Sequence, residues 1–212
     1  MTTLLLIRHG ESEANREGYF AGQSDAALLE KGLVQARITA EFIKNEYNIA
    51  RIYASDLVRA FDTGKALSEL IGLDVIPEKR LREIFAGVWQ GMKFDDIERQ
   101  FDKDYGVWRN DIGNCRTTAG ESVRELGVRV MEALSDIARD NDGKTVAIAT
   151  HATPIRVMQC MIGDGFDSMK NIPWVTNASV TEIIYENGKW ALGRVCRDEH
   201  LSKFRTFFPA NV

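Results

Sequence analysis

The chain is poor in cysteine, and its three cysteines form no closely spaced pair. Cys115, Cys160 and Cys196 are odd in number and occur in no CxxC motif, which argues against a disulfide framework and against a structural zinc site. Free thiols are the rule in reducing compartments. We therefore expect a reduced protein located in the cytoplasm.

An excess of positive charge and a long apolar run are also missing. The 27 Lys and Arg residues are outnumbered by 31 Asp and Glu residues, giving a net charge of −4. This balance argues against non-specific binding to nucleic acid. The apolar stretch near the amino terminus covers only residues 4–7 and ends at Arg8, so we expect neither a signal peptide nor a membrane span.

Internal repeats and low-complexity linkers are absent from the 212 residues. A chain of this length is sufficient for one well-packed α/β domain, whereas two full domains would be a tight fit. We therefore expect a single domain over residues 1–212. Residues 81–118 lack a long clean period and are rich in Trp, Phe, Asp and Gly, so we expect them to form a small capping excursion over the edge of the sheet.

Two of the three histidines come directly after short apolar runs. Residues 4–7 precede Arg8 and His9, and residues 145–150 precede His151. Such runs are typical of buried strands in a parallel sheet. Ligands of open α/β sheets bind at the carboxyl ends of these strands. We therefore expect both histidines at the edge of the sheet where the chemistry takes place.

The hydrophobic pattern predicts the remaining elements of an α/β fold. Asn187-Gly188 between two strand-like runs indicates a hairpin. The expected fold is a three-layer sandwich: a mostly parallel central sheet with an antiparallel edge hairpin, and helices on both faces. The expected strands are residues 49–54, 73–76, 180–185 and 190–195. The expected helices are 29–45, one capped by Ser55, a short one at 95–101, one opened by a capping box of Ser122 and Glu125, and one with Thr153 as cap and Pro154 at its first position.

A histidine beside an arginine at a strand end suits phosphoryl transfer. A neutral imidazole is a competent nucleophile near pH 7, and its attack on phosphorus would give a phosphohistidine. The dianionic group in transfer needs fixed cations and oriented N–H donors. Arg8, Arg59 and Asn15 can supply them, and the amino end of the helix after His151 adds a positive dipole end.

The leaving oxygen must also receive a proton, and the attacking water must later lose one. A carboxyl group is the natural candidate for both steps. Glu83 is set among apolar neighbours and begins the 81–118 excursion. We therefore expect Glu83 to be the acid and base of the reaction.

At this point the motifs resemble those of the histidine phosphatase superfamily, which includes the cofactor-dependent phosphoglycerate mutases. The matching segments follow the family's order over nearly the whole chain: Arg8-His9-Gly10-Glu11-Ser12, Ser55-Asp56-Leu57-x-Arg59-Ala60-x-x-Thr63, Glu83 before Gly87-x-Trp89-Gln90-Gly91, Gly120-Glu121-Ser122, and His151.

The resemblance implies a role for each matching residue. His9 is implied as the phosphorylated nucleophile and Glu83 as the proton donor and acceptor. A phosphate pocket is implied at Arg8, Asn15, Arg59 and His151. Gly22 matches a position whose backbone often contacts substrate. Ala152-Thr153 stand where most relatives have Gly-Gly, which puts the backbone contribution of Ala152 to phosphate binding in question.

Two other classes of function remain open. A metal hydrolase could use two histidines and a glutamate, but the sequence has no HExxH or equivalent ligand spacing, and the arginines would repel a cation. A binding protein with the same fold and no activity is the other class; fold resemblance alone does not establish activity. We expect an enzyme without metal or cofactor, acting on a small phosphorylated metabolite rather than on nucleic acid or a membrane.

Phosphatase and mutase share the phosphohistidine step and differ in whether water or a second hydroxyl accepts the phosphoryl group. The mutases resembled here carry clustered Arg and Lys after the acidic residue. In this chain the excursion is acidic, which suits a smaller or less anionic ester better than a glycerate and favours hydrolysis over mutase activity. Its acidic residues are Asp95, Asp96, Glu98, Asp102, Asp104 and Asp111, against Lys93, Arg99, Lys103, Arg109 and Arg116.

Overall fold

Six strands form one sheet in a computed structural model that describes residues 1–206. The spatial order is β3-β2-β4-β1-β5-β6. The first four of these strands run parallel, β5 is antiparallel to β1, and β6 is antiparallel to β5. The prediction of a mostly parallel sheet with an antiparallel edge hairpin is confirmed. The strands are β1 (Thr2–Arg8), β2 (Ile49–Ala54), β3 (Val75–Pro77), β4 (Thr145–Thr150), β5 (Val180–Glu186) and β6 (Lys189–Leu192).

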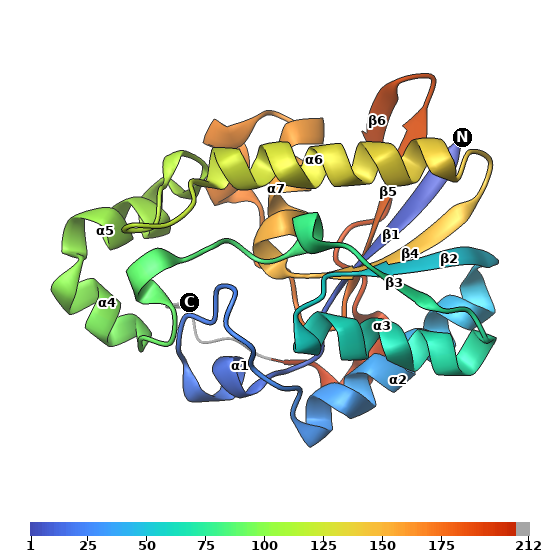
Figure 1. Cartoon of the computed structure of the whole chain (residues 1–212), viewed down its shortest axis with the longest axis horizontal. Helices are drawn as coiled ribbons and strands as arrows, with labels where there is room; N and C mark the ends of the chain where they lie inside the picture. The colour runs from blue at the N-terminus through green and yellow to red at the C-terminus, as the bar shows by residue number, and fades with distance from the viewer. Residues whose placement is uncertain (207–212) are drawn as a thin grey trace.

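Helices cover both faces of this sheet, with α6 on one side and α2 and α3 on the other (Figure 1). The α-helices are α1 (Glu13–Glu17), α2 (Glu30–Glu46), α3 (Val58–Ile71), α4 (Phe94–Gln100), α5 (Asp102–Asn110), α6 (Val123–Asp140) and α7 (Ala152–Ile162). Short 3₁₀ helices are η1 (Lys79–Leu81), η2 (Gly87–Trp89), η3 (Ile112–Asn114), η4 (Phe166–Asn171) and η5 (Glu199–Phe204).

The central strand β1 divides the core into two layers. Successive side chains of a strand point to opposite faces, so Leu4 and Leu6 join the cluster built with α6 and α7. Leu5 and Ile7 join the second cluster, built with α2 and α3. All four side chains are almost fully buried. The three-layer α/β sandwich predicted from the sequence is confirmed.

Two helix starts differ from the prediction. Helix α3 begins at Val58 with Leu57 as its N-cap, so Ser55 does not cap it. Helix α7 begins at Ala152 with His151 as its N-cap, so Thr153 is not the cap, and Pro154 is the third helical residue. A proline fits there because the first four N–H groups of a helix have no intrahelical acceptor. Both N-cap residues, Leu57 and His151, keep an extended backbone.

Other boundaries shift by a few residues. β3 contains Pro77 rather than ending before it, and β6 ends at Leu192 instead of 195. The loop after β1 holds the short helix α1, which the sequence did not indicate. The capping box is confirmed, since the Glu125 N–H donates to Ser122 Oγ at 3.1 Å and the Ser122 N–H donates to Glu125 Oε2 at 2.9 Å. The hairpin turn at Asn187 and Gly188 is also present, and both residues have positive φ angles.

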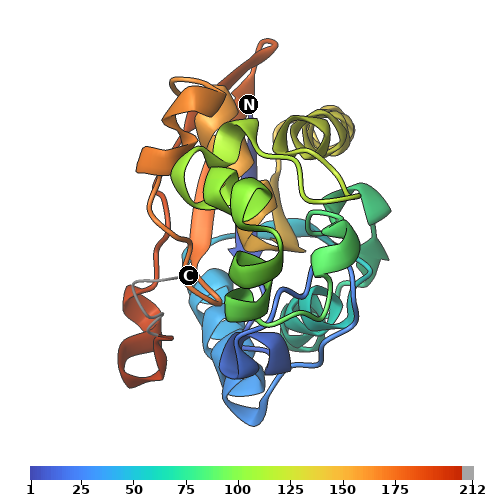
Figure 2. The ribbon, with the colours of Figure 1, turned by 90° about the vertical axis from the view of Figure 1, so that its left-hand side faces the viewer.

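Residues 81–118 contain α4 and α5, which project together away from the sheet (Figures 1 and 2). The sequence predicted the first of these helices and missed the second. Aromatic side chains attach this segment to the loop after β1: the Phe20 ring centroid lies 5.7 Å from Trp89 and 5.1 Å from Trp108. Trp89 is fully buried. The segment therefore has a fixed position beside the carboxyl ends of the parallel strands.

Among residues 1–206, no helix is both long and apolar enough to cross a membrane.

Candidate active site

Three polar residues stand directly after three parallel strands, at one edge of the sheet. His9 follows β1, Ser55 follows β2 and His151 follows β4. The two imidazole rings lie side by side, with their centroids 5.3 Å apart. The structure therefore brings together the two strand-end histidines, as the strand pattern predicted, and adds a serine that the sequence analysis had placed in a helix cap.

A cleft of about 730 Å³ opens at this edge. Seven of the eight predicted site residues line it: Arg8, His9, Asn15, Gly22, Arg59, Glu83 and Ala152. The eighth, His151, is fully buried beside His9. Much of the remaining wall comes from residues 11–21, from α5 and from residues 170–174, so chain segments far apart in sequence close the cleft.

His9 has a fixed ring orientation. Its Nδ1 lies 2.7 Å from the Gly10 carbonyl oxygen, which can only accept, so Nδ1 carries the proton. The lone pair of the neutral ring is therefore on Nε2. Burial and, next, the charges of Arg59 and Arg8 hold the pKa of His9 well below 6.5. His9 thus stays neutral and nucleophilic at Nε2 across the physiological range.

The loop that carries His9 is held by close backbone packing and by polar contacts. A Cβ at Gly10 would lie 2.3 Å from the Gly32 carbonyl oxygen, so glycine is needed where the loop crosses α2. The Gly10 N–H donates to Thr63 Oγ1 at 3.1 Å. The Asn177 amide donates to the His9 carbonyl at 2.9 Å. His9 therefore starts from a rigid backbone position.

His151 is held from behind by Ser55, whose Oγ lies 2.8 Å from His151 Nε2. The opposite ring nitrogen, Nδ1, is buried without a hydrogen-bond partner among the described residues. Burial, followed by the charge of Arg59, holds the pKa of His151 well below its usual value. This ring can therefore offer Nδ1 to a group bound at His9 without adding a permanent charge.

The arginines Arg8 and Arg59 are buried beside these rings. Arg59, from the first turn of α3, donates to the carbonyls of Ser24 at 2.8 Å and Gly22 at 2.7 Å. Arg8 donates from Nη1 to the Val175 carbonyl. Burial lowers the pKa of Arg8 to about 9, and Glu83 offsets part of this effect, so the guanidinium stays charged at neutral pH.

Gly22 lines the cleft and also supports Arg59. Its carbonyl oxygen accepts from Arg59, and its φ of +52° lies in the left-handed region that favours glycine. A Cβ would also lie 2.8 Å from Gln90 Oε1. Gly22 lines the cleft and at the same time orients the Arg59 guanidinium.

Asn15 presents its amide nitrogen to the cleft. Its Oδ1 accepts from the Ser12 N–H at 3.0 Å and from Asn177 Nδ2 at 3.1 Å. Because the oxygen is engaged in this way, the –NH₂ group remains as the donor that Asn15 can offer to a ligand.

Glu83 lines the same cleft as His9 and is half-buried. Oε1 accepts from the Ile84 N–H at 2.8 Å, and Oε2 accepts from the Thr153 N–H at 3.3 Å. The Glu83 carbonyl accepts from Arg129 at 2.8 Å, and Arg129 is itself paired with Glu121. Both the backbone and the carboxylate of Glu83 are therefore positioned at the amino end of α7. The N–H of Ala152, the first residue of α7, has no intrahelical acceptor.

Sequence reasoning missed several residues that the fold brings to this edge. Ser55 and Asn177 position the histidines, and Arg156 and Trp174 line the cleft. The Trp174 ring contacts Arg8, with the Arg8 Cζ 5.6 Å from the ring centroid. The signal for Ser55 was its position after a strand, which also identified His9 and His151.

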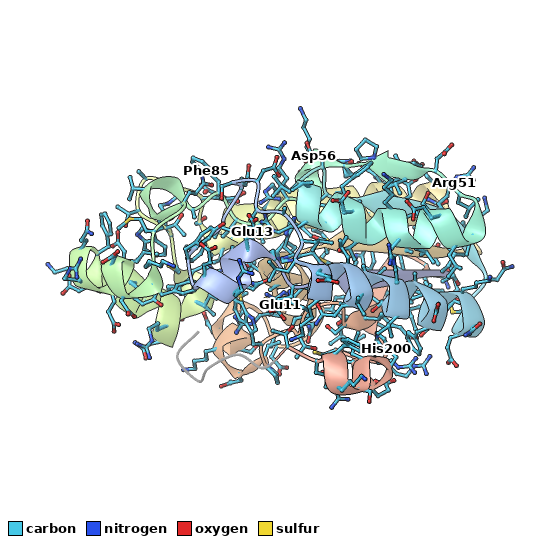
Figure 3. All side chains as sticks on the ribbon, turned by 90° about the horizontal axis from the view of Figure 1, so that it is seen from below. Glu11, Glu13, Arg51, Asp56, Phe85 and His200 are labelled. Atoms are coloured by element: carbon cyan, nitrogen blue, oxygen red, sulfur yellow. The ribbon has the colours of Figure 1, made fainter. Side chains whose placement is uncertain are left out.

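His200, by contrast, lies far from the cleft, on η5 beside α2 (Figure 3). Its side chain is half-buried. Its ring stacks on Phe42 at a centroid distance of 4.4 Å, and Nε2 lies 2.9 Å from Thr39 Oγ1. His200 therefore packs η5 onto the outer surface of the sandwich.

The depressed pKa values of the two site histidines predict that stability falls with acidification. The unfolded chain takes up protons on these rings below about pH 6.5, while the folded protein does so only at lower pH. The free energy of unfolding is then lost as the pH falls through and below 6.5. We expect the free energy of unfolding of His151→Gln, measured with denaturant, to fall less than that of wild type between about pH 7.5 and 5.5. The difference should be up to about 1.4 kcal/mol. Parallel pH profiles of variant and wild type would contradict this prediction.

The family model of the histidine phosphatase superfamily (branch 1) matches residues 4–198. The chain is 32% identical over 162 residues to phosphoserine phosphatase 1 of Hydrogenobacter thermophilus, covering 76% of each chain. It is 32% identical over 195 residues to a probable phosphoglycerate mutase, GpmB, of an Enterobacter species, covering 90% of this chain and 88% of that one. A solved structure of an Entamoeba histolytica phosphoserine phosphatase mutant with phosphoserine superimposes with a TM-score of 0.83 at 27% identity, covering 95% of this chain and all of the other.

These matches, together with the strand-end histidine pair, show that the chain belongs to the histidine phosphatase superfamily. The resemblance found in the sequence is confirmed. The phosphatases among the relatives support a phosphatase reaction through phosphohistidine and make the mutase alternative the less favoured one.

Proposed function

We propose that this chain hydrolyses a small phosphomonoester in two steps, with His9 Nε2 as the nucleophile. The observation that carries the proposal is the Nδ1 contact with the Gly10 carbonyl. It directs the lone pair of a neutral imidazole into a cleft that also holds Arg8, Arg59 and Glu83. A nucleophile, fixed cations and a carboxyl group are the parts that metal-free phosphoryl transfer requires.

In the first step, Nε2 forms a bond to phosphorus while the bond from phosphorus to the ester oxygen breaks. Protonated Glu83 gives its proton to the leaving alkoxide. In the second step, Glu83 takes a proton from water, the water oxygen bonds to phosphorus, and the N–P bond breaks to release inorganic phosphate. Arg8, Arg59, the Asn15 amide, the Ala152 N–H and His151 Nδ1 hold the phosphoryl oxygens through both steps.

A panel of phosphomonoesters tests this function and separates it from a mutase. The panel should include p-nitrophenyl phosphate, O-phosphoserine, and 3-phosphoglycerate with bisphosphoglycerate. Release of inorganic phosphate, without conversion of 3-phosphoglycerate to its isomer, is the expected result. Isomerisation faster than phosphate release would identify a mutase.

Activity should be independent of metal, because the arginines and N–H donors supply the positive charge that a metal would otherwise bring. Within residues 1–206, no group of three or more His, Cys, Asp or Glu side chains is arranged to hold a metal ion. Phosphate release should therefore be unchanged after EDTA treatment and gel filtration. Loss of activity with rescue by zinc or magnesium would support a metal hydrolase instead.

The location of the enzyme in the cytoplasm is part of this proposal. Cys115, Cys160 and Cys196 are free thiols, and burial raises the pKa of Cys115 to about 12 and of Cys160 to about 11. Such thiols are compatible with a reducing compartment, where small phosphorylated metabolites are also found.

A further inference from the structure

One buried cation in the cleft has no part in the phosphate pocket described above. Arg156 lies on α7, one turn beyond Ala152, and is only 6% exposed. It lines the same cleft as His9 and Glu83. Burial lowers the pKa of Arg156 to about 10, so its guanidinium remains charged at neutral pH.

Hydrogen bonds inside the protein use only part of this guanidinium. Arg156 Nη2 donates to the carbonyls of Met169 at 3.0 Å and Ile172 at 3.1 Å. Nε is buried without an acceptor, and no carboxylate among residues 1–206 forms an ion pair with Arg156. A buried charge with unused donors is costly unless a ligand satisfies it.

Trp174 joins Arg156 to the phosphate pocket. Its ring centroid is 5.0 Å from the Arg156 Cζ and 5.6 Å from the Arg8 Cζ. The Trp174 Nε1 is also buried without a hydrogen-bond acceptor in the described part of the chain. The cleft wall next to the phosphate pocket therefore holds two donors, on adjacent side chains, that no protein group satisfies.

The charges of the cleft favour a second anionic group on the substrate. Glu83 is an electrostatic partner of Arg8, Arg59 and Arg156, and Arg59 also faces Asp25. A bound phosphate dianion supplies negative charge to Arg8 and Arg59, and Glu83 is neutral while it carries the proton for the leaving group. Arg156, whose one carboxylate partner among residues 1–206 is Glu83, is then left without a negative charge. A carboxylate matches the planar guanidinium and accepts its N–H groups in pairs.

We propose that Arg156, with Trp174 beside it, binds a carboxylate on the alcohol part of the substrate. The preferred substrates are then phosphomonoesters of hydroxy acids or amino acids. Lys170, exposed at the rim of the same wall, adds positive charge for the approaching anion. This inference rests on the proposed hydrolysis through His9, because it concerns the leaving half of the same substrate.

O-Phosphoserine and O-phosphoethanolamine test the subsite, since they differ only in the carboxylate. Wild-type kcat/KM should be about 10²-fold higher for phosphoserine. Arg156→Gln should lower this ratio to about 5 or less, mainly through a higher KM for phosphoserine. Arg156→Lys keeps the charge but not the paired N–H groups, so its ratio should fall between the two.

The ratio of the two kcat/KM values is independent of the fraction of folded enzyme, so it remains readable in a destabilised variant. If Arg156→Gln does not fold, the ratio can be measured in Arg156→Lys instead. Arg109→Gln is the matched control, because Arg109 also lines the cleft but is exposed and paired with Glu98 at 3.1 Å. The ratio of kcat/KM for phosphoserine to that for phosphoethanolamine should differ between Arg109→Gln and wild type by less than about 3-fold.

The contrary outcomes are distinct. Equal losses on both esters would reduce Arg156 to a support for residues 169–172 and overturn the subsite. Hydrolysis of p-nitrophenyl phosphate through His9, without any preference for phosphoserine, would overturn the subsite and leave the proposed function standing. Failure to hydrolyse any ester, p-nitrophenyl phosphate included, would overturn the proposed function and this inference with it.

Discussion

His9→Ala should lower kcat for every phosphomonoester by roughly 10⁴- to 10⁶-fold, the usual effect of removing a nucleophile. The reason is that Nε2 of His9 carries the lone pair that attacks phosphorus, while Nδ1 donates a hydrogen bond to the Gly10 carbonyl. His151 cannot replace it, because its Nε2 is held at 2.8 Å by Ser55 and its ring is fully buried.

The covalent intermediate gives a direct measurement of the same assignment. Brief mixing of wild-type protein with a phosphomonoester, followed by alkaline quenching, should trap an acid-labile phosphoryl group, and mass spectrometry should place it on His9. His200→Gln serves as the control, since His200 stacks on Phe42 away from the cleft and should leave the adduct unchanged. An adduct on His151, or full turnover by His9→Ala, would show that the assignment is wrong.

Glu83→Gln should slow the hydrolysis of alkyl phosphates by roughly 10²- to 10⁴-fold. An alkoxide leaves poorly without a proton, whereas nitrophenolate leaves readily. The first step with p-nitrophenyl phosphate should therefore slow much less. Single-turnover release of nitrophenolate isolates this step from the later attack of water, in which Glu83 acts as the base.

Glu11 provides the comparison for Glu83, because it lines the same cleft. Its Oε2 is engaged by Lys31 and by Thr206 Oγ1, both at 2.8 Å, so it is not available to a leaving group. Glu11→Gln should preserve the difference between alkyl and nitrophenyl esters. Equal losses on both substrates in Glu83→Gln would mean that Glu83 only positions the phosphate. A large loss on alkyl esters alone in Glu11→Gln would make Glu11 the proton donor.

The substrate prediction rested on the composition of one segment, and the structure shows how few of its charges lie at the cleft. The acidic balance of residues 81–118 suggested a less anionic ester. In the structure, Arg99 pairs with Asp96 at 2.6 Å and Arg109 with Glu98 at 3.1 Å. Among the charged residues of α4 and α5, only Arg109 lines the cleft, and the other lining residues of these two helices are aromatic. Arg156 and Lys170 come from a different part of the chain.

The sequence by itself determined the sheet, the two strand-end histidines and the capping box of α6. These features depend on local signals: short continuous apolar runs that end at polar residues, and a serine followed three residues later by a glutamate. The motif order also identified the family. Its site residues could be listed because each occupies a fixed position relative to a strand or helix end.

Only the tertiary structure decided how these residues are held and which others join them. The ring position of His151 depends on Ser55, which follows a different strand, and Asn177 reaches His9 over a long sequence separation. From its sequence context, Arg156 is an ordinary helix residue. Its contacts with the Met169 and Ile172 carbonyls exist only because α7 packs against residues 169–172. Such contacts join segments that are distant in the chain, and their energies arise only when the sheet closes, so no local pattern encodes them.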